Sequence, residues 1–481
     1  MGSDMRISIV MAVLLLALPF SGRSEQRERR VPWQGNSTLR YAPDGKLCQI
    51  LLDGNDLTYR ERGAVGGFQE EPIVVNGRPL RGEQPMLLFD AQGRPNIVDS
   101  CREKASAGWY RKSGGAWEVV GSPGKAVPGK AGAGIKLPRP INRLTGLPTN
   151  WEGYVPRADY MDRPAHMLWS GLAASFVPDG SLRILFCDEP DGRNVPAPTN
   201  TFFHLYLGSN AGDGSWRWTV VETFQRDWCA ADYYNPPRYF SFVVDRQGRN
   251  HILYARGFSD NWPEKPRRKC SELRYVSDSS GQWRSEVVSA PLRATADAAW
   301  GASLAVDADG NLAVASQYIS RGPGASPENS DLLFHRRQAD GSWTREKIPV
   351  PPDGYKAADG QKGTGAYPYL VFDGKNLPHI VFCDFATQHW PKWHCMDYCG
   401  QIRYAQYDGT RWSVETLYRQ TDPLRHQVRF PIVAVTDSEL SFAGMRRINT
   451  VDKEGAILSI EDEYIEGRIV LPFVAATDGA K

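Results

Sequence analysis

The chain has 481 residues, of which 41% are hydrophobic and 23% are charged, and its formal net charge is +2. A chain of this length can bury a substantial core. The charge is nearly balanced and no basic stripe is clustered along the sequence, which argues against nucleic acid as a partner.

The first 25 residues have the pattern of a secretory signal peptide. Arg6 is followed by the apolar run ISIVMAVLLLALPF and then by the small residues of SGRS, an order of charge, apolar core and cleavage region that export signals share. The apolar run is shorter than the roughly 20 residues that a membrane-spanning helix needs. The sequence therefore predicts a signal peptide over 1–25 and an exported protein, secreted or periplasmic, without a membrane span.

Short β-type runs recur through the rest of the chain, separated by turns that contain Asp. Residues 364–420 show the plan, with the runs PYLVF, HIVFC, IRYAQY and WSVETL joined in pairs by Asp-Gly turns. Such runs are typical of strands and tight hairpins, and a recurring four-stranded antiparallel unit is the signature of a β-propeller blade. The predicted fold is all-β, a single propeller over 38–472. Its seven blades are expected at about 38–75, 84–121, 166–225, 237–290, 300–350, 364–420 and 427–472.

Two kinds of residue keep their phase from unit to unit. The turn aspartates are Asp44, Asp90, Asp179, Asp245, Asp307, Asp373 and Asp437. The outer-strand tryptophans, one hairpin later, are Trp117, Trp216, Trp283, Trp343 and Trp412. Since a ring exposes strand edges unless it closes, we expect a terminal strand to complete it.

The connections between the predicted strands differ on the two rims of the ring. Those between strands one and two, and between three and four, are short Asp-Gly turns, whereas the others are long and irregular. The long connections are 122–165, 188–200, 226–236, 257–270, 318–331 and 384–400. Long loops on a rigid scaffold usually carry function, so the rim that bears them, here called the elaborated rim, is the expected binding face.

Aromatic, guanidinium and carboxylate side chains are expected to converge on the elaborated rim, where innermost strands begin and second strands end. These residue types suit a sugar-chain groove, because aromatic rings stack on sugars and Arg contacts carboxylate or sulfate in bidentate geometry. Alternatively, the charged residues pair with one another and the aromatic residues seal the channel. The candidates for substrate binding are His426, Arg429, Arg446, Trp300, Tyr367, Asp188 and Asp384.

The position of each histidine in the repeat indicates whether it is structural or a candidate for function. His251 and His379 occupy the same repeat position, so we expect them to be structural. His335 lies in a predicted third strand at a position that resembles Tyr404, and it is also expected to be structural. His166, like His426, precedes an innermost strand, which makes it a better candidate for chemistry.

Eight cysteines in an exported chain favour disulfide bonds. Cys395 and Cys399 lie in the cluster QHWPKWHCMDYCG, whose spacing fits no strong zinc pattern. We therefore expect a disulfide-pinned loop there and no metal site, with Cys383 as a candidate partner. The sequence contains no P-loop, GxGxxG or haem-attachment motif and identifies no cofactor.

The repeat DxxGxxHIxY followed by LxYxxxxxGxWxxE resembles that of secreted propellers with BNR-like repeats. Among these it is similar to seven-bladed polysaccharide lyases, the ulvan lyases and rhamnose–glucuronate lyases, over about 38–472. In such lyases an Arg neutralises a uronate carboxylate, and a His or Tyr removes the proton at the adjacent carbon. The resemblance implies Tyr239 and Arg256 of the fourth blade as a catalytic pair, with His166 as a further catalytic candidate.

The leading expectation is therefore a polysaccharide lyase that cleaves uronate-containing glycans by β-elimination, with a positioned base and a group that neutralises charge. One alternative is a glycoside hydrolase that uses rim carboxylates such as Asp188, Glu189 and Asp384. Another is a non-catalytic glycan- or protein-binding propeller, because fold alone does not decide function. The expected partner is an acidic polysaccharide, and the expected state is a monomer.

Overall fold

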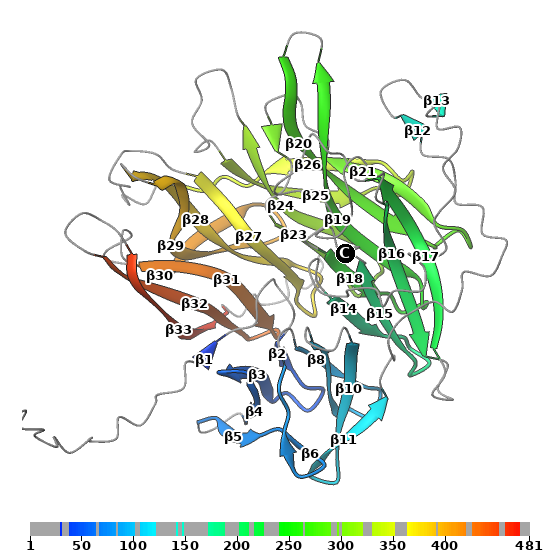
Figure 1. Ribbon diagram of the computed structural model, residues 1–481, viewed down its shortest axis with the longest axis vertical. Coiled ribbons are helices and arrows are strands. Elements are labelled where there is room, and N and C mark those ends of the chain that lie inside the picture. The colour runs from blue at the N-terminus through cyan, green and yellow to red at the C-terminus, as the bar shows by residue number, and fades with distance from the viewer. Residues whose placement is uncertain are drawn as a thin grey trace, which may run out of the picture.

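In a computed structural model the chain forms a ring of seven antiparallel β-sheet blades (Figure 1). The described residues are 29–30, 38–63, 67–82, 85–101, 106–121, 141–142, 147–148, 172–187, 202–210, 216–225, 240–262, 265–289, 296–297, 301–320, 330–351, 363–390, 393–419, 426–451 and 457–471. Every regular element within these ranges is a strand, which confirms the predicted all-β, seven-bladed propeller. None of the described segments is a helix that could cross a membrane. The predicted signal peptide lies outside the described residues.

The blades follow one another in chain order. Blade one holds β2 (Leu39–Tyr41), β3 (Leu47–Asp53), β4 (Asp56–Arg62) and β5 (Gln69–Pro72), with β1 (Arg29–Arg30) beside β3. Blade two holds β8 (Met86–Phe89), β9 (Pro95–Cys101), β10 (Ser106–Ser113) and β11 (Ala116–Gly121). Blade three holds β14 (Leu172–Phe176), β15 (Leu182–Cys187), β16 (Phe202–Asn210) and β17 (Trp216–Gln225). Blade four holds β18 (Phe240–Val244), β19 (Asn250–Trp262), β20 (Lys265–Ser277) and β21 (Arg284–Ser289).

The later blades keep the same order. Blade five holds β23 (Ala302–Val306), β24 (Leu312–Ser320), β25 (Ser330–Arg337) and β26 (Trp343–Lys347). Blade six holds β27 (Gly363–Phe372), β28 (Pro378–Trp390), β29 (Trp393–Tyr407) and β30 (Trp412–Arg419). Blade seven, within the described residues, holds β31 (His426–Val435), β32 (Glu439–Val451) and β33 (Ile457–Val470). The remaining short strands are β6 (Val74–Val75), β7 (Arg78–Pro79), β12 (Ile141–Asn142), β13 (Leu147–Pro148) and β22 (Ala296–Asp297), the last of which links blades four and five.

The turn from the innermost to the second strand is built on the predicted aspartates in blades two, four, five and six. In blade seven Thr436 takes this role, and Asp437 instead accepts the backbone N–H of Gly374 from blade six. Asp90 Oδ1 accepts the backbone N–H groups of Gln92 at 3.0 Å and Arg94 at 2.9 Å. The same two bonds, to the second and fourth residues on, are made by Asp245, Asp307 and Asp373. Asp side chains that bond their own backbone in this way favour tight turns. In blades one and three the turn starts at Ala42 and Val177, and the marker aspartate lies two residues later.

The histidines of blades four and six are structural, as predicted. Nδ1 of His251 lies 2.6 Å from the Tyr275 hydroxyl, and Nε2 lies 3.0 Å from Oδ2 of Asp245. Burial lowers the pKa of His251. Burial alone would raise the pKa of Asp245, but hydrogen bonds from His251 and Arg249 outweigh it and hold that pKa below its usual value. A neutral imidazole thus ties the ionised turn carboxylate of Asp245 to the third strand. In blade six Nδ1 of His379 likewise lies 2.5 Å from the Tyr404 hydroxyl, but Nε2 lies 3.3 Å from Oδ2 of Asp373 and makes no hydrogen bond within the described part of the chain.

His335 is buried and structural, but it is one residue out of the predicted phase. Phe334 lies at the position of Tyr404 in blade six, as the pairing of β24 with β25 shows. Blade five has Ala313 in place of the structural histidine, so it offers no imidazole for a phenol to bond. His335 faces the other side of its strand, where Nε2 lies 3.0 Å from Oγ of Ser316.

His335 is expected to make stability depend on pH. Burial lowers its pKa to about 4, against about 6.5 in the unfolded chain. Above pH 6.5 the imidazole is neutral in both the folded and the unfolded chain, and the free energy of unfolding has its full value. As pH falls below that value the unfolded chain takes up a proton that the folded chain excludes, so the free energy of unfolding drops by about 3 kcal/mol on approaching pH 4. Denaturant unfolding from pH 7.5 to 4.5 measures this slope, and His335→Gln should flatten it. An unchanged slope in that variant would assign the effect to other groups.

The predicted tryptophans pack one blade against the preceding one. Trp412 of β30 meets Phe334 of blade five edge to face, with ring centroids 5.1 Å apart, and Trp343 of β26 meets Tyr275 of blade four at 5.4 Å. Such aromatic pairs stabilise the fold beyond the effect of the area that they bury.

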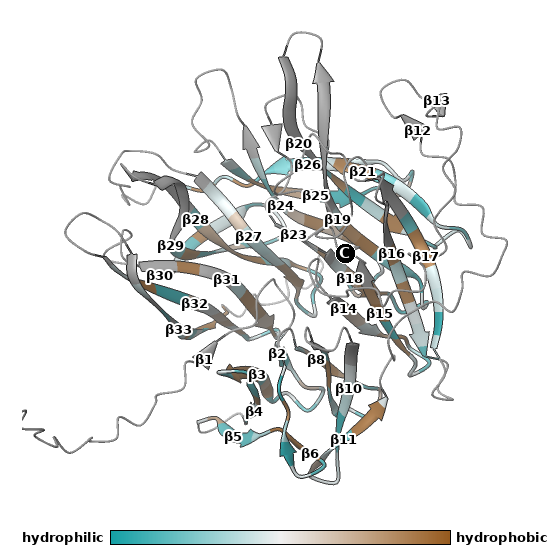
Figure 2. Ribbon diagram, in the orientation of Figure 1, coloured by the Kyte–Doolittle hydropathy of each residue, from teal (hydrophilic) through white to brown (hydrophobic). Residues whose placement is uncertain are grey.

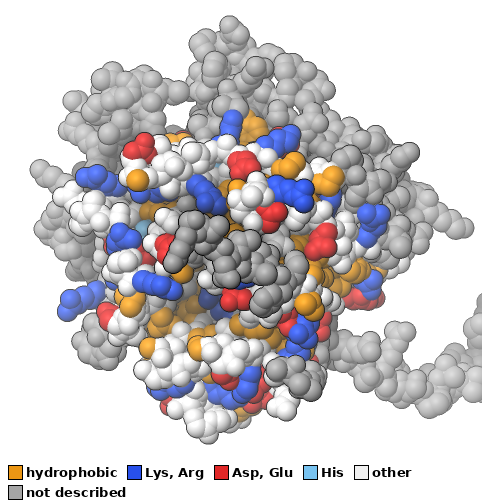
Figure 3. Space-filling model, turned by 180° about the vertical axis from the view of Figure 1, so that it is seen from behind, with side chains coloured by type: hydrophobic (Ala, Val, Ile, Leu, Met, Phe, Trp, Pro, Cys, Tyr) orange, Lys and Arg blue, Asp and Glu red, His pale blue; other side chains and the backbone are white. Residues whose placement is uncertain are grey.

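Hydrophobic stretches run along the strands of the blades (Figure 2). On the face seen in Figure 3, Lys and Arg side chains are mixed with Asp and Glu, and the coloured residues form no stripe of a single charge.

Blades one and seven are joined by side chains. The buried guanidinium of Arg60 on β4 donates from Nε to Oε1 of Gln49 at 2.8 Å and from Nη2 to the Tyr464 hydroxyl at 2.8 Å, and it forms an ion pair with Glu466. The ring centroid of Phe68 lies 3.8 Å from its Cζ. The expected closing strand is not found among the described residues, where β1 pairs with β3 and no strand of blade one pairs with β33.

Candidate functional site

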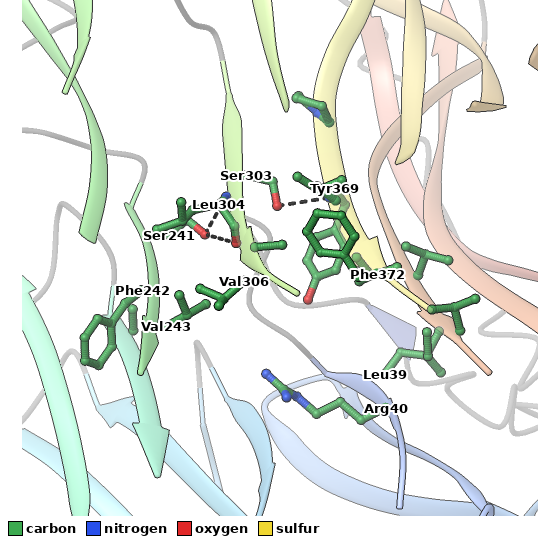
Figure 4. Close-up of a pocket in the computed structure, with 18 of the residues that line it drawn as sticks. Leu39, Arg40, Ser241, Phe242, Val243, Ser303, Leu304, Val306, Tyr369 and Phe372 are labelled. Atoms are coloured by element: carbon green, nitrogen blue, oxygen red, sulfur yellow. Dashed lines mark hydrogen bonds between the residues drawn. The ribbon is translucent and has the colours of Figure 1, made fainter. Parts of the chain in front are cut away.

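The innermost strands enclose a cavity of about 600 Å³ along the axis of the ring. It extends from Gly301 and Tyr367, where the innermost strands begin at the elaborated rim, to Pro43 and Phe372 beside the short turns. Most of its lining is apolar (Figure 4). The polar side chains that line it are Arg40, Tyr41, Ser241, Ser303, Tyr367 and Tyr369.

Two of the lining serines fasten neighbouring innermost strands together. Oγ of Ser241 on β18 accepts the backbone N–H of Leu304 on β23 at 3.0 Å, and Oγ of Ser303 accepts the N–H of Leu370 on β27 at 3.0 Å. Both bonds appear in Figure 4. These hydroxyls therefore hold the wall of the cavity between blades four, five and six.

Tyr367 stands at the mouth of the cavity in a left-handed backbone conformation, with φ of 51°. The strand that carries it, β27, shifts register against β28 between Gly363 and Ala366 and again between Ala366 and Tyr369. Bulges of this kind bend a strand and re-aim its side chains. A left-handed residue other than glycine costs about 1–3 kcal/mol and persists where its surroundings enforce it, often at functional sites. The start of β27 is thus shaped to hold Tyr367.

Two glycines leave the space that this conformation requires. A Cβ on Gly301, whose φ is 116°, would lie 3.3 Å from Cα of Tyr367 in the next blade. A Cβ on Gly365, whose φ is 86°, would lie 2.9 Å from Cα of Leu332. Any side chain at Gly365 would push the bulge away from blade five. The position of Tyr367 therefore depends on both glycines.

The repeat makes Tyr367 the counterpart of Tyr239, and Asp384 the counterpart of Arg256. Each tyrosine precedes the turn aspartate of its blade by six residues, and Asp384 and Arg256 each follow the structural histidine by five. Tyr239 itself lies outside the described residues. The backbone of Arg256 lies on β19 opposite Glu272, while its side chain is outside the described part.

Asp384 is held by its own blade. Its Oδ1 accepts a hydrogen bond from Thr364 Oγ1 at 2.6 Å, and its Oδ2 accepts bonds from Gln401 Nε2 at 2.7 Å and Arg403 Nη1 at 3.2 Å. Burial raises the pKa of Asp384, although these donors and the charge of Arg403 oppose the rise. Because both oxygens are occupied, the carboxyl anchors the bulged start of β27 to β28 and β29.

Arg446 is the counterpart of Asp384 in blade seven, and it too has partners within the protein. It forms an ion pair with Glu463 on β33, and its Nη1 lies 3.3 Å from the hydroxyl of Tyr418 in blade six. Asp384 and Arg446 therefore belong to the wall of the elaborated rim, and Tyr367 belongs to its mouth.

The other predicted site residues are placed only in part. Arg429 and His426 lie on β31, opposite Met445 and Ile448, with their side chains outside the described part. His166, Trp300 and Asp188 lie wholly outside the described residues. The structure thus places Tyr367 and Asp384 in blade six, where Asp384 bonds Thr364, three residues before Tyr367. The proposed catalytic residues stay a prediction.

The described cysteines lie inside blades. Cys48 is a buried free thiol that accepts a hydrogen bond from the Tyr59 hydroxyl at 3.1 Å, and burial raises its pKa to about 11. The thiol of Cys383 donates to the carbonyl oxygen of Val428 at 3.7 Å. The side chains of the remaining cysteines, including the 395–399 cluster, lie outside the described residues, so the disulfides remain a prediction.

Arg40 lines the cavity, although no motif or loop position in the sequence predicts a role for it. It lies in the middle of β2, away from any long loop. The repeat nevertheless marks it, because the other blades have uncharged residues two positions before the turn. These residues are Leu88, Ser175, Val243, Ala305, Val371 and Ala434.

Comparisons with known proteins leave the activity unassigned. No family model and no curated protein matches the sequence. Among solved structures, the polysaccharide lyase Uly1 is 11% identical, with 91% of this chain and 90% of that chain covered and a TM-score of 0.44. A protein of unknown function from Dyadobacter fermentans DSM 18053 is 12% identical, with 92% and 98% covered and a TM-score of 0.37. A family PL25 ulvan lyase is 12% identical, with 88% and 82% covered and a TM-score of 0.35. Likeness this distant carries no argument about the site, whose chemistry rests on the residues of this chain.

Proposed function

We propose that this chain is a carbohydrate-active propeller that cleaves a uronate-containing polysaccharide by β-elimination at the elaborated rim. The observation that carries the proposal is the strained backbone of Tyr367 at the mouth of the axial cavity. Two bulges and two close glycine contacts maintain it, at a ring position that recurs in blade four as Tyr239. A scaffold that needed only to close a channel would not require a tyrosine in this conformation.

The proposed reaction uses the pair in blade four. A uronate carboxylate lies against the guanidinium of Arg256, which stabilises the negative charge that develops when the adjacent carbon loses its proton. Tyr239 accepts that proton as the phenolate, with His166 as a second candidate base. The carbon–oxygen bond to the neighbouring sugar then breaks, a carbon–carbon double bond forms, and the leaving oxygen takes up the proton that the base has gained. Substrate contacts are assigned to His426, Arg429, Trp300, Tyr367 and Asp188, whereas Asp384 and Arg446, which are bonded within the protein, support the wall of the rim.

Hydrolysis by two carboxylates is less well supported. A general acid must present a proton to the glycosidic oxygen, but both oxygens of Asp384 are already hydrogen-bonded within blade six. A binding propeller without catalysis is the second candidate. Its support is the mouth of the cavity itself, which an acidic glycan could occupy without reacting.

A panel of acidic polysaccharides tests the proposal. Incubation with the purified protein should raise the ultraviolet absorbance of unsaturated uronate products for at least one polymer, in step with new reducing ends. New reducing ends without that absorbance would establish hydrolysis instead. Retention on an immobilised polysaccharide with neither signal would establish the binding module.

A further inference from the structure

Arg40 is the one charged side chain among the described residues that line the axial cavity. Its backbone pairs with Cys48 in the β2–β3 hairpin. Figure 4 shows its guanidinium reaching from β2 into the open space, with Tyr369 extending into the same space from β27. Arg40 lies two residues before the short turn, and Tyr367 lies six residues before it. At about 3.3 Å per residue in a regular strand, and less across the bulge of β27, Arg40 lies at most about 13 Å deeper along the strand direction than Tyr367.

No carboxylate in the described part of the chain neutralises this guanidinium. Nε of Arg40 is buried and has no hydrogen-bond partner. Two arginines of the same blade behave differently, since Arg60 and Arg62 form ion pairs with Glu466 and Glu439 of blade seven. A buried polar atom of a charged group is costly unless it has a partner. Arg40 thus lacks within the described protein the partner that its position calls for.

The scaffold does not need an arginine at this position. The six other blades place uncharged residues there, from Ala305 and Ala434 to Leu88. Several of these are small, so the guanidinium has room to extend across the axis. A side chain that the ring can do without, and that carries an unpaired charge, is a candidate for binding a ligand.

We propose that the axial cavity binds a small organic anion through Arg40, with a carboxylate or sulfate as the recognised group. The two-pronged guanidinium matches the paired oxygens of both groups, and the Tyr369 hydroxyl adds a polar contact in the same space. The apolar wall suits the carbon skeleton of the ligand. A volume of about 600 Å³ lies within the range of about 300–1,000 Å³ typical of small-molecule sites. The argument for this site uses neither residue of the proposed catalytic pair, so it does not depend on the proposed function.

Thermal unfolding and titration calorimetry of the intact protein test this site. The probes are sodium glucuronate and sodium sulfate, with glucose as the neutral control, all at one ionic strength set with sodium chloride. Glucuronate or sulfate should raise the unfolding temperature, and glucose should not. Binding of glucuronate at least as tight as that of sulfate would support an organic anion as the occupant, whereas binding of sulfate alone would overturn the organic part of the proposal. No shift with either anion would overturn the proposal.

Variants at Arg40 make the test specific. Arg40→Leu should weaken anion binding at least tenfold and abolish the temperature shift. Without added anion it should unfold at the same or a higher temperature than the wild type, because blade two already carries Leu88 at this position. Arg40→Lys keeps the charge but loses the bidentate fork, so its binding should be intermediate. Arg217→Gln removes an exposed arginine on β17 and should leave the response intact. Equal anion responses in wild type and Arg40→Leu would place the site elsewhere.

Discussion

Tyr239→Phe is expected to reduce the rate of β-elimination by about 10²- to 10⁴-fold, the range that a general base contributes. The phenol oxygen is the only group that the substitution removes, so the unfolding temperature should stay within a degree or two of the wild type. Initial rates of unsaturated uronate formation, measured at saturating and at low substrate, separate a loss in kcat from a change in KM. On the proposed mechanism the loss falls on kcat, because the base acts in the transition state.

Tyr367→Phe is the matched control for that experiment. Tyr367 occupies the same repeat position two blades away, and its strained backbone is described directly. If it shapes the mouth and binds substrate, removal of its hydroxyl should change KM more than kcat. Full activity of Tyr239→Phe together with loss of kcat in Tyr367→Phe would show that the catalytic base is Tyr367 of blade six and not Tyr239. Arg256→Lys should recover part of the activity that Arg256→Ala loses, because the charge remains while the bidentate geometry does not.

The scaffold could be predicted from the sequence because its determinants are local and repeated. Asp245 bonds the backbone two and four residues on, and His251 reaches a tyrosine on the adjacent strand. Such contacts leave the same spacing in every blade that has them. Blade five departs from the repeat, because Ala313 replaces the structural histidine. There the repeat spacing predicted the position of His335 wrongly by one residue.

The site and the closure of the ring were harder to predict, because they depend on contacts between distant segments. The left-handed conformation of Tyr367 depends on Gly301 in another blade and on two bulges that no turn motif signals. Arg40 looks like an ordinary strand residue until the ring places it beside six uncharged counterparts. The hydrogen bond between Arg60 and Tyr464 joins residues 404 positions apart. The sequence therefore does not reveal whether a paired strand or side-chain contacts close the ring.

Arg60→Met is expected to lower the free energy of unfolding by about 3 kcal/mol. The substitution removes the hydrogen bonds that the guanidinium donates to the carbonyl oxygen of Gln49 and to the Tyr464 hydroxyl, and a hydrogen bond to a charged group contributes about 1.5–3 kcal/mol. It also removes the ion pair with Glu466 and the cation–π contact with Phe68. Met retains most of the apolar stem, so the loss reports the polar contacts. Urea unfolding followed by tryptophan fluorescence measures it.

The location of the damage distinguishes closure from general stability. If the cluster around Arg60 joins blades one and seven, amide hydrogen exchange in Arg60→Met should rise first in β2, β4 and β33, while β19 and β28 keep their protection. Arg111→Met is the control, because Arg111 pairs with Glu118 across the surface of a single blade and such pairs contribute about 0.2–1 kcal/mol. A uniform rise in exchange around the ring, or an equal loss of stability in Arg111→Met, would mean that the seam between blades one and seven has no special role in holding the ring closed.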